Sequence, residues 1–202
     1  LKGENMQRIF DNIRDELLPA LSDAMKLSER SDFCVGYFNL RGWRKIDELI
    51  DEWAGGEGSC CRLLVGMQPL PQEQLRSAMS IIKKDEQIDN ATAIAMKKKL
   101  AQEFRDQLTF GVPTNADEKG LRKLAEQLEK QKLVVKLFLR HPLHAKLYLT
   151  FRQDPINPII GFLGSSNLTL AGLLKQGELN VDVLDHDSCC KLSQWFEERW
   201  ND

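Results

Sequence analysis

Short apolar runs that end on turn residues are the feature that most limits the folds open to this chain. Two of them, 32–38 and 61–67, are separated by a helical stretch, RKIDELIDEW, that stops before Gly55–Gly56. Further apolar runs then follow in close order at 133–139, 143–151, 158–164 and 178–184. A strand–helix–strand unit followed by nearly adjacent strands predicts an α/β fold, with a mixed β-sheet flanked by helices.

The sequence pattern predicts helices in three further places. Apolar residues recur at threes and fours over 6–25, which indicates an opening amphipathic helix that Pro19 interrupts. Residues 72–132 are charged and helical in pattern, so we expect a helical insertion there. A last helix carries apolar side chains over 192–200, which we expect to anchor it to the core.

Length and composition fit an ordinary globular protein. At 202 residues the chain is the size of one domain, 1–202, and 42% of its residues are hydrophobic and 29% charged. The net charge of −2 means that any contact with nucleic acid must depend on a local basic patch. Since the chain begins at Leu1 rather than Met, we expect a domain excised from a longer protein.

Cysteine usage and hydropathy indicate in which cellular compartment the protein is expected. The five cysteines include two adjacent pairs and no C-x-x-C spacing, which favours neither a disulfide framework nor a zinc site. No apolar run approaches the roughly 20 residues that span a bilayer, and no signal-peptide pattern opens the chain. We therefore expect a cytoplasmic protein that does not enter a membrane.

The nine residues HPLHAKLYL, starting at His141, carry two of the three histidines. Apolar and polar residues alternate here, so the pattern predicts a strand with His144 and Lys146 on the same side, about 7 Å apart. An imidazole and an ammonium so placed suit an anionic ligand. His141, just before a proline, is expected in a loop that lines the groove.

A second group of polar residues follows the next predicted strand. That strand ends on Gly164 and passes into Ser165, Ser166 and Asn167, and Glu178 lies on the strand after it. A strand-to-helix junction of this kind offers free backbone N–H groups, and serine and asparagine side chains can donate to anionic oxygens. The stretch therefore predicts an anion site.

Together these residue types suit phosphodiester chemistry. An imidazole such as that of His144 can attack phosphorus or protonate a leaving oxygen near neutral pH. Lys146 and Asn167 would hold the non-bridging oxygens, and Glu178 would fix the histidine tautomer. Neither a metal ion nor another cofactor is required, because Lys146 supplies the cation. DVLDHD, beginning at Asp182, is interpreted as solvated acids rather than a metal cluster.

The motifs HAKLYL, GSSNLT and GELN resemble those of the phospholipase D superfamily, whose signature is H-x-K followed by G-S-x-N. They are most similar to the nuclease-like branch found in some restriction endonucleases and beside bacterial helicases. The resemblance spans about 32–184, including VGYFNLRGW near its start. It implies that His144 is a nucleophile that forms a phosphohistidine intermediate.

The same resemblance assigns the other site residues. Lys146, Ser165 and Asn167 would bind phosphate, and Glu178 would orient His144. The residues expected to border the substrate are His141, Gly164, Ser166, Tyr37 and Asn39. For Tyr37, packing in the core is an equally open alternative.

Two departures from the family pattern matter. The fuller motif has Asp five residues after the lysine, where this chain has Phe151. The chain also has a single H-x-K, whereas the family reaction uses two histidines. Family members with one copy pair two chains, so a homodimer with a shared site is implied.

The predicted function is therefore metal-independent cleavage of DNA within a larger helicase or restriction protein. No G-x-x-x-x-G-K-[ST] motif occurs, so a helicase or ATPase partner domain would have to lie elsewhere in the full-length chain. Two alternatives stay open. The domain could hold DNA without cleaving it, or it could be a phosphatidyl or other phosphodiester transferase.

Overall fold

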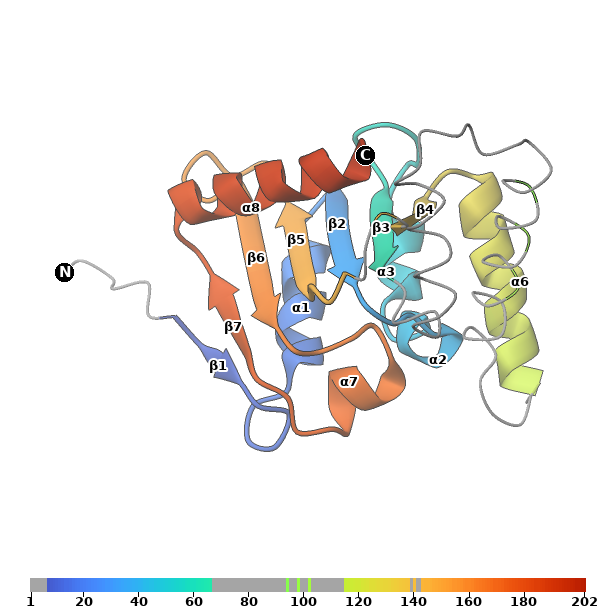
Figure 1. Ribbon diagram of the computed structural model, residues 1–202, viewed down its shortest axis with the longest axis horizontal. Coiled ribbons are helices and arrows are strands. Elements are labelled where there is room, and N and C mark those ends of the chain that lie inside the picture. The colour runs from blue at the N-terminus through green and yellow to red at the C-terminus, as the bar shows by residue number, and fades with distance from the viewer. Residues whose placement is uncertain are drawn as a thin grey trace, which may run out of the picture.

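One sheet organises the molecule, which we describe from a computed structural model. The structure describes residues 7–66, 94, 98, 102, 115–138, 140 and 143–202. Within these residues, seven strands form a sheet in the order β1-β7-β6-β5-β2-β3-β4 (Figure 1). The strands are β1 (Ile9–Phe10), β2 (Arg30–Val35), β3 (Cys61–Gly66), β4 (Leu133–Phe138), β5 (Leu147–Phe151), β6 (Ile159–Gly164) and β7 (Asn180–Val183).

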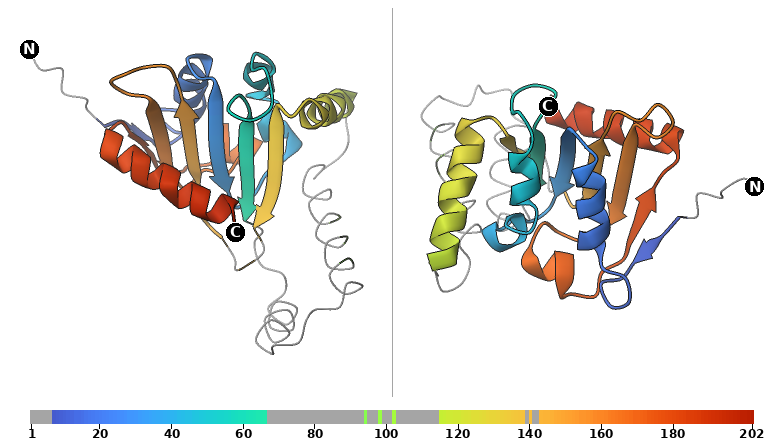
Figure 2. Two further views of the ribbon diagram at one scale, coloured as in Figure 1. Left: turned by 90° about the horizontal axis from the view of Figure 1, so that it is seen from above. Right: turned by 180° about the vertical axis from the view of Figure 1, so that it is seen from behind.

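The sheet is mixed, as the strand pattern predicts. β2, β3 and β4 are parallel, whereas β5, β6, β7 and β1 join the other side of β2 in antiparallel pairs. The helices are α1 (Leu17–Lys26), α2 (Leu40–Trp43), α3 (Asp47–Asp51), α6 (Asn115–Glu129), α7 (Leu170–Leu174) and α8 (His186–Trp200). α8 crosses one face of the sheet, while α1 and α3 cover the other (Figure 2). The predicted α/β fold is confirmed.

Two apolar clusters lie on the two faces of the sheet. Alternate residues of β2 enter different clusters: Phe33 packs with α1 and α2, and Cys34 packs with α8. Trp43 and Phe196, each fully buried, anchor α2 and α8 to the two clusters. The aromatic residues predicted to anchor the last helix therefore do so.

The opening helix is shorter than its period predicts. α1 begins only at Leu17, and Ile9–Phe10 form β1 instead, which pairs with β7. Asn12 breaks the helical pattern, because it adopts a left-handed φ of 57° and its side-chain oxygen accepts from the Leu17 amide at 3.0 Å. Pro19 lies in the first turn of α1, where no helical N–H bond is lost, so it causes no interruption.

Three other predicted boundaries change. β5 starts at Leu147, so His144 and Lys146 precede the strand instead of lying within it. Of the helix predicted from RKIDELIDEW, only Asp47–Asp51 form a helix, α3, and a separate short helix, α2, precedes the stretch. Of the predicted insertion at 72–132, the structure describes residues 94, 98 and 102 and then 115 onward, where α6 leads into β4; the rest lies outside the described residues.

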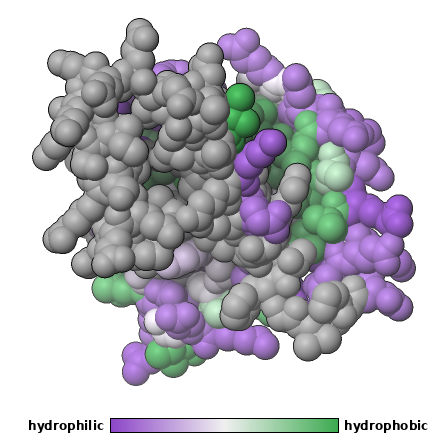
Figure 3. All heavy atoms as spheres, turned by 45° about the vertical axis from the view of Figure 1, so that its right-hand side comes forward, coloured by the Kyte–Doolittle hydropathy of each residue, from purple (hydrophilic) through white to green (hydrophobic). Residues whose placement is uncertain are grey.

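The surface in Figure 3 is mainly hydrophilic where it is described, with smaller hydrophobic areas between. No helix among the described residues has the length and apolar character needed to cross a bilayer. Exposed apolar side chains do occur at the β1–β7 edge, where Ile9 is 60% exposed and Leu179 is 61% exposed. This edge adjoins the candidate site.

Candidate active site

The candidate site lies at one edge of the sheet, where four chain segments meet. β2 and β6 end at this edge, and β5 and β7 begin there, because β5 runs antiparallel to both β2 and β6. The backbone of Phe38, just after β2, forms a bridge with Leu168, just after β6. This topology brings residues near 37, 146, 167 and 178 together.

His144 and Lys146 are in contact. The Lys146 Nζ atom lies 3.2 Å from the His144 Nδ1 atom and donates a 2.8 Å hydrogen bond to the His144 carbonyl oxygen. The histidine is exposed, whereas Lys146 is only 9% exposed. Burial lowers the pKa of Lys146, and the nearby Glu178 carboxylate opposes this shift. The pair presents an exposed imidazole backed by a buried cation.

Asn167 is oriented toward this pair by the end of β2. Its side-chain oxygen accepts a 2.9 Å hydrogen bond from the Tyr37 backbone amide. A Cβ built on Gly36 would lie 3.3 Å from that oxygen and 3.7 Å from Lys146 Nζ, so Gly36 adjoins both groups. With its oxygen engaged, the Asn167 amide NH2 is the group that can donate to a phosphate oxygen.

Ser165 and Glu178 form a pair beside Asn167. The Ser165 hydroxyl donates to the Glu178 carboxylate and accepts from the Leu179 amide at 2.9 Å. Since a hydroxyl has one proton, Ser165 in this arrangement orients Glu178 and cannot also donate to a phosphate. That Glu178 in turn orients His144 stays a prediction.

Ser166, predicted to border the substrate, is instead completely buried. Its amide donates to the Asn180 side-chain oxygen at 3.2 Å, and its hydroxyl accepts from the Asn180 amide group at 2.8 Å. The Tyr148 hydroxyl donates to the Ser166 carbonyl at 2.8 Å. Burial raises the pKa of Tyr148 well above its usual value, so this hydroxyl remains a donor. These contacts fix the loop that carries Asn167.

The remaining predicted residues lie around this centre. Gly164 ends β6 and is exposed, and a Cβ there would clash with the Leu179 carbonyl at 2.2 Å. Asn39 caps α2, because its side chain accepts from the Gly42 amide at 2.8 Å. The Tyr37 side chain is partly buried. His141 lies outside the described residues.

Three residues that matter here escaped the sequence analysis. Gly36 and Asn180 act as described above, and Gly66 is the third. A Cβ on Gly66 would lie 2.2 Å from the Leu143 carbonyl, so only glycine lets the segment before His144 pass the end of β3. For Gly36 and Gly66, the position of a glycine at the end of a buried strand was the sequence signal that another segment passes close by.

The acids near Asp182 have partners within the fold. Asp182 is completely buried and accepts from the Arg8 backbone and side chain at 2.6 and 2.7 Å. Asp185 caps α8 by accepting from the Ser188 amide at 2.8 Å. Within the part of the chain that the structure describes, no three metal-ligating side chains come together.

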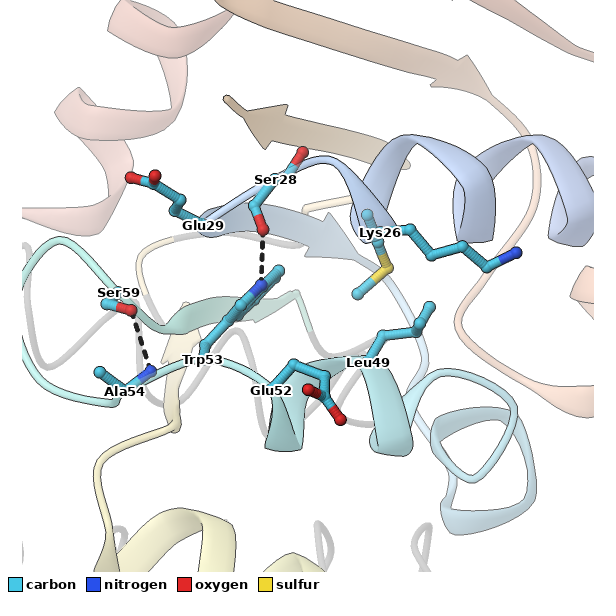
Figure 4. Close-up of a pocket in the computed structure, with 9 residues that line it drawn as sticks. Lys26, Ser28, Glu29, Leu49, Glu52, Trp53, Ala54 and Ser59 are labelled. Carbon is cyan, nitrogen blue, oxygen red and sulfur yellow. Dashed lines mark hydrogen bonds between the residues drawn. The ribbon is translucent and has the colours of Figure 1, made fainter. Parts of the chain in front are cut away.

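A separate cavity of about 320 Å³ lies at the opposite edge of the sheet, before β2 and β3. Figure 4 shows Trp53 there between Glu29 and Glu52, with its indole N–H donating to the Ser28 carbonyl at 2.7 Å. Glu29 and Glu52 offset the charge of Lys26 there, so this cavity carries no excess positive charge for a phosphate. Phosphate binding at the His144 edge stays a prediction.

Comparison with known proteins identifies the family of the chain. A family profile described as "Cardiolipin synthase, PLD-like domain" matches residues 18–200. The chain belongs to this PLD-like family. The predicted membership of the phospholipase D superfamily is confirmed by this match, whereas its nuclease-like branch stays a prediction. No curated protein matches the chain significantly.

Solved structures of PLD-like proteins share the fold. NucT from Helicobacter pylori is 11% identical with a TM-score of 0.54, over 97% of this chain and 96% of that one. Nuc from Salmonella typhimurium, a phospholipase D family member, is 10% identical with a TM-score of 0.54, over 97% and 94%. Phosphatidylserine synthase from Haemophilus influenzae is 17% identical with a TM-score of 0.51, over 100% and 39%.

Proposed function

We propose that this PLD-like protein is a metal-independent phosphodiesterase that cleaves DNA through a phosphohistidine intermediate. The observation that carries the proposal is the contact between an exposed His144 and a buried Lys146 beside Asn167. An imidazole supplies the nucleophile, and the ammonium and the Asn167 amide stabilise the charge that develops on the phosphoryl oxygens.

The reaction would proceed in two displacements. The His144 Nε2 lone pair forms a bond to phosphorus while the bond to the leaving oxygen breaks, and a second imidazole gives that oxygen a proton. Water then attacks phosphorus, loses a proton to the second imidazole, and the N–P bond breaks. We assign the second imidazole to His144 of the partner subunit in a homodimer, since this chain has one H-x-K motif.

A pair of arginines beside the site supports nucleic acid as the substrate. Arg41 and Arg44 both contact the Asp117 carboxylate, at 3.3 and 3.8 Å. Gly42 between them packs on Leu168, in the segment that follows Asn167. Two basic residues thus lie in the segment after β2, in a chain whose net charge is −2, and they are candidates to contact a nucleic-acid backbone.

The names of the similar structures agree with a nucleic-acid substrate. NucT and Nuc carry names of nucleases, although their low identity shows only a shared fold. The proposed cellular setting is a helicase or restriction protein in the cytoplasm, and the free thiols of all five cysteines suit a reducing compartment.

The test is hydrolysis of plasmid DNA and of bis(p-nitrophenyl) phosphate in excess EDTA, with His144→Ala as the matched variant. We expect wild-type cleavage of both, and a loss of at least about 10³-fold in the variant because the nucleophile is gone. Equal rates for the two proteins would reject the proposal. Duplex binding without cleavage by either protein would support the non-catalytic module, which Phe151 in place of the family's acid favours.

A further inference from the structure

A cavity of about 480 Å³ lies between the end of α8 and strands β3 and β4. Leu64 and Phe138 line it from the two strands, and together with Trp200 of α8 they belong to the second apolar cluster. Figure 2 shows the end of α8 beside the ends of β3 and β4. The volume of this cavity, which we call the α8 pocket, is in the range typical of pockets that hold small molecules.

Three basic side chains line the α8 pocket. Lys136 and Arg140 lie on β4 and just after it, and Arg199 lies in the last turn of α8. Arg140 pairs with Asp202 at 2.8 Å, and Arg199 contacts Glu198 at 3.6 Å. Lys136 forms no ion pair with any described carboxylate, so the cations outnumber the acids that pair with them. The pocket therefore favours an anionic ligand.

Two of these cations can donate to a ligand. The Lys136 ammonium donates to the Trp200 carbonyl at 2.7 Å, which uses one of its three hydrogens. The Arg140 side chain is 71% exposed, and its guanidinium has five N–H donors, of which the contact with Asp202 occupies only part. Arg199 is held over the Trp195 ring at 3.9 Å, so it adds positive charge from a fixed position.

A row of paired residues across the sheet links the α8 pocket to the candidate active site. Lys136 pairs with Leu64, Leu64 with Cys34, and Cys34 with Leu147, which directly follows Lys146. Three strand spacings separate Lys136 from Leu147, which is about 14 Å. One strand of B-DNA covers this distance in about four nucleotides, at roughly 3.4 Å each.

The segment that carries His144 also passes close to the end of β4. Phe138 pairs with Gly66, and the Leu143 carbonyl lies 2.2 Å from the position of a Cβ on that glycine. Since Leu143 directly precedes His144, the histidine segment lies one strand away from the end of β4. Arg140 follows that end by two residues.

We propose that the α8 pocket is a second nucleic-acid site, which holds a nucleotide of the strand whose cleaved phosphate lies at His144. The inference rests on the proposed function and adds where the substrate is held beyond the reacting phosphate. Lys136 and Arg140 would donate to the phosphate of that nucleotide, and Leu64 and Phe138 would contact its sugar or base. Phosphate contacts carry no direct sequence information, so we expect a preference for strand length and none for sequence.

The experiment measures the binding of oligothymidylates of two and of ten nucleotides to a parent protein with His144→Ala, in which no cleavage occurs. Lys136→Gln/Arg140→Gln removes the two donors of the α8 pocket. Lys26→Gln/Lys191→Gln is the matched control, because it also removes two exposed cations, each paired with an acid on its own helix. Fluorescence anisotropy at several salt concentrations gives the affinities, and thermal unfolding checks the fold.

We expect the ten-nucleotide strand to bind the parent at least about 10-fold more tightly than the dinucleotide, which is too short to reach both sites. Lys136→Gln/Arg140→Gln should weaken binding of the longer strand by about 20-fold at roughly 0.1 M salt and lower the slope of log K against log salt by about 1.4. Its affinity for the dinucleotide should not change. The control should bind both strands as the parent does.

The exposed position of Arg140 allows a milder variant. Arg140→Gln alone should weaken binding of the longer strand by about 5-fold, and it decides the matter if the double variant does not fold. Equal affinity of this variant, the double variant and the control for the longer strand would overturn the inference. If the double variant then also unfolds at a lower temperature, Lys136 and Arg140 serve only to hold the end of α8.

Other results separate this inference from its neighbours. An equal loss of affinity for both strand lengths would overturn it, because the α8 pocket would then not lie beyond the reacting phosphate. Binding of thymidine monophosphate that is equally sensitive to Lys136→Gln/Arg140→Gln would replace the strand by a free nucleotide. If the strands bind as expected while the protein with His144 intact cleaves neither DNA nor the ester, the second site stands and the proposed chemistry fails.

Discussion

The contact between Lys146 and His144 fixes the resting form of the imidazole. A charged ammonium can only donate, so at 3.2 Å the His144 Nδ1 atom is the acceptor and Nε2 carries the ring hydrogen. In that form the ring is a proton donor through Nε2. For Nε2 to attack phosphorus, the hydrogen must move to Nδ1 and Lys146 must release that atom, so that a carboxylate such as Glu178 can accept from it.

The Ser165–Glu178 pair makes a prediction about coupling. Because the Ser165 hydroxyl donates to Glu178, Ser165→Ala should act mainly by releasing that carboxylate. We expect Ser165→Ala and Glu178→Gln each to slow ester hydrolysis by about 10- to 100-fold, and the double variant to be no slower than the slower single one. The hydrolysis rates of wild type, the two single variants and the double variant, measured at saturating ester, give a double-mutant cycle. Multiplicative losses would show that Ser165 acts independently, as a direct phosphate ligand would.

Asn180 should matter for stability as well as for activity. Asn180→Ala leaves the buried amide and hydroxyl of Ser166 without their partner. We expect a loss of about 2 kcal/mol in the free energy of unfolding, measured in urea. Ser166→Ala/Asn180→Ala also removes the hydroxyl that has lost its partner, so it should lower the free energy of unfolding little more than Asn180→Ala alone. A single variant as stable as wild type would contradict the role given to Asn180.

Among the elements, α8 is held to the sheet by an arginine as well as by the apolar contacts of Phe196. Arg62 on β3 donates to the buried Asp32 at 2.6 and 2.7 Å and also pairs with Glu197 of α8. Its guanidinium lies 5.1 Å from the ring centroid of Phe196 and 5.3 Å from that of Trp200. The hydrogen bond from Arg62 is the main cause that lowers the pKa of Glu197 below its ordinary value of 4.5.

Arg62→Met should therefore destabilise the fold by about 3 kcal/mol at pH 7, because it leaves a buried carboxylate with less compensation. A lowered folded-state pKa stabilises the protein above 4.5, and this contribution is lost as the pH falls below that value. The difference in the free energy of unfolding between wild type and Arg62→Met should therefore become smaller as the pH falls below 4.5. Urea unfolding between pH 3 and 7 measures it. Arg122→Met, at an exposed pair with Glu118, is the control and should change stability by less than about 0.5 kcal/mol.

Arg41 on α2 and Arg44 just after it give two predictions of opposite sign for the affinity for DNA. If Arg41 and Arg44 bind DNA phosphates, Arg41→Gln/Arg44→Gln should weaken binding of single-stranded DNA and reduce the slope of log K against log salt by about 1.4. Asp117→Asn should strengthen binding, because it removes a negative charge that contacts both arginines. Fluorescence anisotropy in a His144→Ala background measures both, with Arg122→Gln as control. Weaker binding by Asp117→Asn would show that the three residues serve only as a structural link.

At the level of elements, sequence patterns located six of the strands but not β1. Its two residues, Ile9 and Phe10, have no strand period of their own and are defined by pairing with β7. The opening helix was overextended because Asp11 and Asn12 compete for backbone hydrogen bonds, which periodicity does not register. The site motifs were readable since they are local. The roles of Gly36, Gly66 and Asn180 were not, because the residues that each of them contacts are set by tertiary structure.

For the whole molecule, a shared site predicts a particular response to mixed subunits. If each active site needs His144 from both copies, a mixed dimer of wild type and His144→Ala has no complete site. After exchange of an equal mixture through denaturation and refolding, activity should fall to about one quarter of that of refolded wild type. Light scattering confirms that the mixture is dimeric. Retention of about one half would mean that each copy works independently.

The link between the two halves of the chain has a consequence for synthesis. The hydrogen bond from Tyr37 to Asn167 spans 130 positions, and Asn180, which fixes the same loop, comes later still. A growing polypeptide on the ribosome can form β2 and β3 early, but it holds no assembled phosphate site until its final strand and helix have emerged. We therefore expect a fragment that ends before β7 to lack the proposed cleavage activity, because it cannot fix the loop that carries Asn167.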